Sequence, residues 1–152
     1  MRPLSVKELF DSAQLEVSAR VSWQTPVPEL QPGIYVVVAN AEQIDVSHLP
    51  QSERDFWIPG QSIVYIGCTK RSLRTRLNQF YRHRFGDRSP HRGGQALTLL
   101  KCQLWVYWAC PDDPHHNEHV LIEEFKNRTG GRRPFGNRRN EKKAMLEQLE
   151  TL

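Results

Sequence analysis

The chain lacks the long apolar segments that mark membrane proteins and secreted precursors. No hydrophobic run approaches the roughly 18 consecutive apolar residues that a membrane span requires. The first eight residues contain Arg2, Lys7 and Glu8, so they do not form the apolar centre of a signal peptide. We therefore predict a cytoplasmic protein without a membrane partner.

Cysteine is also scarce, and its spacing is informative. The three cysteines stand at positions 68, 102 and 110, an odd number without a paired C-x-x-C spacing. This pattern argues against a disulfide framework and predicts reduced, mostly buried thiols. Histidines at positions 115, 116 and 119 follow the last cysteine, but no second Cys or His pair lies at finger-like spacing, which disfavours a zinc site.

The remaining composition is that of one ordinary globular domain. The 152 residues are 38% hydrophobic and 25% charged, which suits a single modest core. We predict three parts along the chain: an N-terminal helix with a proline-rich connector at 1–32, the core at 33–140, and a C-terminal tail or short helix at 141–152.

The net charge of +4 conceals two concentrated basic segments. Residues 70–94 and 126–143 each contain eight lysines and arginines against one acidic residue, which leaves −10 for the rest of the chain. Two such segments on an otherwise acidic protein favour a face that binds a polyanion such as DNA. For either segment alone, a solvated helix face or tail is the alternative. The residues predicted to contact DNA are Lys70, Arg71, Arg74, His83, Arg92, Arg132, Arg133 and Arg138.

Apolar patterning predicts an α+β fold. Runs of branched and aromatic residues indicate three strands, at 33–39, 62–68 and 104–110. Helical patterns indicate the elements that cover this sheet. These are a short helix capped by Ser5, a basic helix through Leu73, Leu77 and Phe80, helical character at 95–100, and a helix from about 115 to 126 that Gly130-Gly131 ends.

Two connections are candidates for special roles. Residues 41–61 form a long link between the first two strands, and 52–57 within it could form one helical turn with Phe56 and Trp57 packed on the sheet. Substrate recognition is the alternative role for this link. Residues 86–94 contain three glycines and predict a cationic loop.

Two tyrosines and one glutamate are candidates for chemistry. If the first two strands are neighbours, Tyr35 and Tyr65 lie near the first turn of the basic helix, and phenols together with guanidinium groups suit a phosphodiester. Glu118 lies on the apolar stripe of the last helix, where a carboxylate needs a positive partner such as a divalent metal. The alternatives are ordinary core packing for the tyrosines and a helix-dipole interaction for the glutamate.

The tripeptides Gly33-Ile34-Tyr35 and Tyr65-Ile66-Gly67, followed by a basic helix, are similar to the signature of the GIY-YIG nuclease superfamily. The resemblance covers roughly residues 33–140 and implies a GIY-YIG-like fold and a metal-dependent DNA endonuclease. Its reaction would be hydrolysis of a phosphodiester by in-line attack of water, with Mg²⁺ or Mn²⁺ as cofactor. Restriction, a mobile element, repair and defence all remain open as biological roles.

The resemblance also implies roles for five residues. Tyr35 would assist deprotonation of the water, and Tyr65 and Arg76 would hold the phosphate. A phenol that acts as a base needs its pKa lowered by nearby cations. Glu118 would be the metal ligand, and Asn137 would support the site by hydrogen bonding.

Some positions depart from the family pattern. Arg74 is an alternative for the catalytic arginine, and Asn140 for the asparagine, because the spacings differ from those of many relatives. Several relatives have a histidine four residues after the arginine, where this chain has Phe80; His83 lies one turn further on. This departure favours a rival hypothesis, a non-catalytic nucleic-acid-binding module on the same fold. RNA cleavage and a homo-oligomer also stay open.

Overall fold

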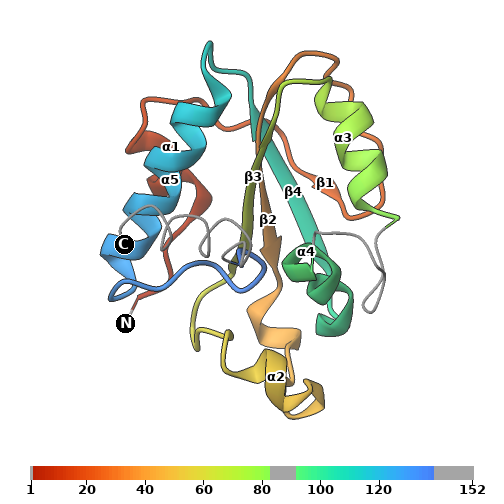
Figure 1. Cartoon of the computed structure of the whole chain (residues 1–152), viewed down its shortest axis with the longest axis vertical. Helices are drawn as coiled ribbons and strands as arrows, with labels where there is room; N and C mark the ends of the chain where they lie inside the picture. Colours follow the sequence, from red (N-terminus) through yellow and green to blue (C-terminus); the bar gives the residue numbers. More distant parts are fainter. Residues whose placement is uncertain (1, 83–91, 139–152) are drawn as a thin grey trace, which may run out of the picture.

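Four antiparallel strands form the centre of the α+β structure, a computed structural model that describes residues 2–82 and 92–138 except for the side chains of 41, 92 and 93 (Figure 1). Their order in the sheet is β1 (Val21–Ser22), β4 (Leu104–Ala109), β2 (Gly33–Ala39) and β3 (Ile63–Thr69). The three predicted strands are confirmed to within one residue at each end. The predicted number of strands is wrong, because β1 pairs with β4.

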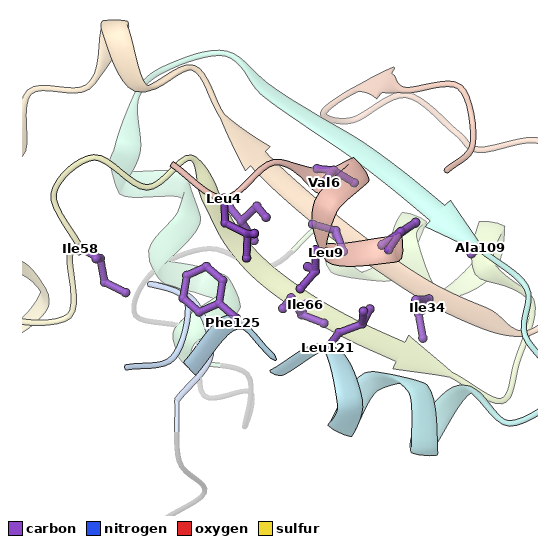
Figure 2. Close-up of a cluster of buried hydrophobic side chains, with 12 residues drawn as sticks. Leu4, Val6, Leu9, Ile34, Ile58, Ile66, Ala109, Leu121 and Phe125 are labelled. Atoms are coloured by element: carbon purple, nitrogen blue, oxygen red, sulfur yellow. The ribbon is translucent and has the colours of Figure 1, made fainter. Parts of the chain in front are cut away.

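Helices cover both faces of the sheet. In β2, Ile34 and Val36 point to the face covered by α1 (Val6–Asp11) and α5 (Pro114–Arg128), which lie on one side in Figure 1. Figure 2 shows this cluster of buried side chains. The next residues in the alternation, Tyr35 and Val37, point to the opposite face. That face is covered by α3 (Leu73–Phe80), α4 (Arg92–Ala96) and the 3₁₀-helix η3 (Leu97–Leu100).

The N-terminal segment belongs to this core. The Ser5 capping box is confirmed, since Ser5 Oγ accepts from the Glu8 N–H at 3.1 Å and the Glu8 carboxylate accepts from the Ser5 N–H. Leu9 and Phe10 of α1 are fully buried against β2, β3 and α5. The helix of the N-terminal segment thus packs into the same hydrophobic cluster as the strands.

The last helix begins and ends for local reasons. Asp113 caps α5 by accepting from the His116 N–H at 3.2 Å, and Pro114 occupies the first helical position, where its missing N–H costs nothing. Gly130 follows the helix with φ +72°, and the Gly131 N–H returns to the Lys126 carbonyl at 2.7 Å. The predicted glycine stop is confirmed, and the helix starts one residue before the predicted position.

The connection between β2 and β3 holds structure of its own. It contains the 3₁₀-helices η1 (Ala41–Gln43) and η2 (Val46–His48), followed by α2 (Gln51–Arg54). Trp57 packs edge-on against Phe135 with ring centroids 5.7 Å apart, whereas Phe56 is 45% exposed. The predicted packing therefore holds for Trp57 and fails for Phe56.

The predicted glycine-rich loop is shorter than expected. α4 already begins at Arg92, and a Cβ atom at Gly94 would lie 2.5 Å from Phe80 Cε2. Glycine therefore allows α4 to pack directly against the Phe80 ring. His83, Asn140 and the predicted tail at 141–152 lie outside the described residues, as does the Arg92 side chain. Within 2–82 and 92–138, no helix combines the length and apolarity needed to cross a membrane.

Candidate active site

The pairing of β2 with β3 brings the two tyrosines together. Tyr35 lies opposite Gly67, and Tyr65 lies opposite Val37, two residues further along β2. An irregularity in the pairing after Val37 lets Val64 and Tyr65 both pack on the α3 face. The tyrosine rings stack with centroids 5.9 Å apart and planes inclined by 22°.

Gly67 makes room for this arrangement. A Cβ atom at position 67 would lie 2.6 Å from Tyr35 Cζ, 2.7 Å from Tyr35 Oη and 2.7 Å from Tyr65 Cε1. Such distances are below van der Waals contact, so any side chain would displace both rings. The glycine of the second tripeptide therefore has a steric function in placing the two phenols.

Burial keeps both phenols neutral. Tyr35 is fully buried, and among the described residues its hydroxyl has no hydrogen-bond partner in good geometry, although Arg76 and Tyr65 lie close to it. Burial, reinforced by Tyr65, raises the pKa of Tyr35 well above its usual value, and the nearby Arg76 only partly opposes this. Burial also raises the pKa of Tyr65. Within the protein alone, Arg76 does not bring the pKa of either phenol below its usual value.

Arg76 borders the tyrosines from α3. Its half-buried guanidinium lies 5.7 Å from the Phe80 ring centroid and influences the pKa of both phenols. Arg74 is exposed on the same helix. The geometry thus favours Arg76 over Arg74 as the arginine of the site.

The first turn of α3 has no free backbone donors for a phosphate. The N–H of Leu73 donates to the Gln31 carbonyl at 2.9 Å, and the N–H of Arg74 donates to the Glu29 carbonyl at 3.0 Å. The N–H of Thr75 is capped by Ser72 Oγ at 3.0 Å. An anion at α3 must therefore be bound by side chains.

Glu118 approaches from α5, on the other side of β3. Its half-buried carboxylate has no ion pair among residues 2–82 and 92–138. Glu118 lies near Cys68, and burial together with this carboxylate raises the pKa of the Cys68 thiol to about 12. Because Glu118 also acts on Tyr65, the carboxylate, the thiol and the phenol form one electrostatic cluster at the end of β3.

Asn137 binds the free edge of β3. Its Oδ1 accepts from the Ile66 N–H at 2.9 Å, and its Nδ2 donates to the Ile66 carbonyl at 2.8 Å. The Gly136 N–H adds a bond to the Val64 carbonyl. Because β3 is an edge strand, these bonds satisfy backbone groups on both sides of Tyr65 and hold it in place.

The predicted DNA contacts divide into two groups. Lys70, Arg71, Arg74 and Arg133 are exposed. Arg132 and Arg138 instead have partners within the protein, although Arg132 is also exposed. Arg132 donates to the carbonyls of Asp55 and Trp57 at 2.7 and 3.2 Å.

Arg138 is largely buried. It forms an ion pair with Glu53 at 2.7 Å, the two side chains being 14% and 2% exposed, and its guanidinium lies 3.7 Å from the Phe56 ring centroid. A guanidinium held in this way cannot reach a DNA backbone.

Two residues of the site environment were not singled out from the sequence. Cys68 was interpreted only as a buried thiol, and His115, considered only for zinc, lies with Nδ1 3.4 Å from Cys68 Sγ. The one available signal was strand alternation, which turns Cys68 away from the tyrosine face and toward α5. The partner of that thiol depends on a tertiary contact that no local pattern reveals.

The described residues contain no group of three or more His, Cys, Asp or Glu side chains arranged around a metal. Comparison of the chain with protein-family models, curated proteins and solved structures gives no match. The functional interpretation therefore rests on the geometry of the site and on the sequence resemblance.

Proposed function

We propose that this chain is a metal-dependent DNA endonuclease with a GIY-YIG-like fold. The observation that carries the proposal is the convergence of Tyr35, Tyr65, Arg76 and Glu118, from four different elements, around the end of β3. The core alone does not require this arrangement, since it buries one hydroxyl with no hydrogen bond in good geometry and leaves one half-buried carboxylate without an ion pair among the described residues.

Glu118 fits a hard divalent cation. Mg²⁺ commonly binds through one or two carboxylates and completes its shell with water and substrate phosphate oxygens, so a single protein ligand is compatible with Mg²⁺ or Mn²⁺. The neighbouring Cys68 is a soft ligand, which a hard cation such as Mg²⁺ does not prefer. When bound, the metal would supply Lewis-acid stabilisation of charge on the phosphate oxygens.

The remaining groups act as hydrogen-bond donors to the phosphate. Arg76 has a planar guanidinium that matches two phosphate oxygens and is held at the rim of the tyrosine pair. Tyr65 is partly exposed and neutral, so its hydroxyl can donate to the same group. Tyr35 lies behind Tyr65 with its hydroxyl beside Arg76 and Tyr65, so it would orient these two donors toward the phosphate; the role of base that the resemblance implies for Tyr35 stays an alternative.

Exposed cations extend from this site. Lys70 and Arg71 follow β3 directly, and Arg74 lies on the first turn of α3. Because the backbone N–H groups of that turn are already bonded, these side chains would provide the contacts to flanking phosphates. We expect affinity for DNA that falls steeply as salt rises.

One observation favours a second candidate, the non-catalytic nucleic-acid-binding module. Phe80 is 1% exposed and its ring lies 4.8 Å from that of Tyr65, so an apolar group fills the place where a histidine donor would stand. A module of this kind would bind DNA through the same cations without needing Glu118.

Replacement of Glu118 separates the two candidates. Glu118→Gln removes the carboxylate but preserves its shape, and we expect cleavage of supercoiled plasmid in Mg²⁺ or Mn²⁺ to fall by roughly 10³-fold while DNA binding persists. Glu123→Gln is the matched control, because Glu123 lies on the same helix and pairs with Lys126 at 3.2 Å. Plasmid nicking is measured with each metal and with a chelator. If the wild-type protein binds DNA but cleaves neither plasmid nor branched DNA, the nuclease proposal is wrong and the non-catalytic binding module remains.

A further inference from the structure

The site contains an imidazole that the sequence resemblance does not assign. The described residues include four histidines, at positions 48, 115, 116 and 119. His48 pairs with Asp45 in η2, far along the chain from the site. Among the described residues, His115 is the histidine whose ring contacts the cluster at the end of β3, through Cys68 Sγ.

Cys68 connects His115 to the groups proposed to bind phosphate and metal. The thiol lies within the electrostatic reach of Glu118, Arg76 and Lys70. His115 stands three residues before Glu118 on α5, so the two side chains share one face of the helix. Figure 1 shows that the start of α5 and the start of α3 lie at the same end of the sheet, where β3 ends. The imidazole therefore borders the site on the side opposite Arg76.

The contact with Cys68 also orients the ring. Where the thiol donates to Nδ1 across this contact, the proton of a neutral imidazole is on Nε2. His115 is exposed, so this second nitrogen is available to a ligand. Both the neutral ring in this tautomer and the protonated ring present an N–H at Nε2.

We propose that His115 binds an oxygen of the target phosphodiester through Nε2–H, and that Cys68 is the positioning residue that holds its ring. This inference rests on the proposed function and adds a donor from α5 to the donor Arg76 from α3. It also explains how the site can tolerate Phe80: the imidazole that α3 lacks at that position is provided by another helix.

The test compares three substitutions at two positions with a control. We expect His115→Phe to lower the cleavage rate by about 30-fold, because one hydrogen bond to a charged group contributes about 2 kcal/mol. His115→Gln should stay within a few-fold of wild type, since its amide can donate in place of Nε2–H. Cys68→Ala should cost less than His115→Phe. His116→Phe, an exposed neighbour on α5, should leave cleavage unchanged.

A second readout keeps the inference separable from the proposed function. The affinity of each variant for a short DNA duplex is measured without divalent metal, and thermal unfolding checks that each variant is folded. If wild type cleaves and His115→Phe cleaves equally well, the inference is wrong and the nuclease stands. If wild type binds without cleaving, the nuclease is wrong, and the inference survives only if His115→Phe weakens binding more than His116→Phe does. Absence of both activities in wild type would overturn both.

Discussion

The two ends of β3 treat buried polar groups in opposite ways. Near the start of the strand, beside α2 in Figure 1, Glu53 and Arg138 are paired at 2.7 Å, and the guanidinium is also covered by Phe56. Near the other end, the buried Tyr35 hydroxyl lies close to Arg76 and Tyr65 but has no hydrogen bond in good geometry among the described residues. At the α2 end, each buried charge therefore has an opposite charge beside it. At the tyrosine end, the buried hydroxyl has no comparably well-placed partner.

This difference indicates that the tyrosine end of β3 is the end that evolved for binding. A buried polar group that is paired keeps the fold unique and stable, whereas one left unpaired costs about 1–3 kcal/mol. Such a cost persists in a protein when the group serves a function. Substitutions at the α2 end should therefore mainly change the stability of the protein. Substitutions at the tyrosine end should mainly change its activity.

The largest effect on stability is expected from breaking the ion pair. Glu53→Gln leaves the largely buried Arg138 guanidinium without its counter-charge, and we expect a loss of about 3 kcal/mol in the free energy of unfolding. Urea denaturation measures this loss. Cleavage per folded molecule should not change, because the Glu53 carboxylate pairs with Arg138 and not with Tyr35, Tyr65 or Arg76.

Glu42→Gln provides the control for this substitution, since Glu42 is exposed in the same connection between β2 and β3. It should alter stability by less than about 0.5 kcal/mol. A Glu53→Gln protein with normal stability but much weaker cleavage would contradict the proposed difference between the two ends of β3, because the α2 end would then belong to the active site.

Substitution of Asn137 should have a smaller effect on stability and should also reduce cleavage. Asn137→Ala leaves the N–H and carbonyl of Ile66 without their partner, which should cost about 2 kcal/mol of stability. Because Ile66 adjoins Tyr65, cleavage should also fall, by roughly 10-fold. Asn127→Ala on the exposed side of α5 is the control. If the substitution reduced stability alone, Asn137 would have no part in positioning the site.

Much of the fold follows from local sequence. The strand at 33–39 is bounded as predicted, because Pro32 and Gly33 lead into a run of branched and aromatic residues. β1 could not be predicted, since two residues carry no periodicity, and Val21 and Ser22 become a strand only by pairing with β4. Phe56 was wrongly placed on the sheet because its cover, Arg138, comes from a distant part of the chain.

The candidate site was predicted in its members and not in its chemistry. Strand pairing suffices to bring Tyr35 and Tyr65 together, and helix spacing suffices to place Glu118 on a helix face. The raised pKa values of the phenols arise from burial by α3 and its neighbours, which depends on the complete tertiary structure. The contact between Cys68 and His115 likewise joins β3 and α5, and no local sequence pattern predicts that these two residues meet.

The most direct test of this account is to measure the unfolding free energy and the cleavage rate of Tyr35→Phe on one preparation. Tyr81→Phe is the control, since the Tyr81 hydroxyl donates to the Thr25 carbonyl at 2.9 Å and its loss should destabilise the protein by about 1 kcal/mol. We predict that Tyr35→Phe instead stabilises the protein by up to about 1 kcal/mol, while cleavage falls by roughly 10-fold because Arg76 and Tyr65 lose the hydroxyl that orients them toward the phosphate. A destabilised Tyr35→Phe protein that cleaves DNA at the wild-type rate would contradict the claim that this end of β3 gives up stability for catalysis.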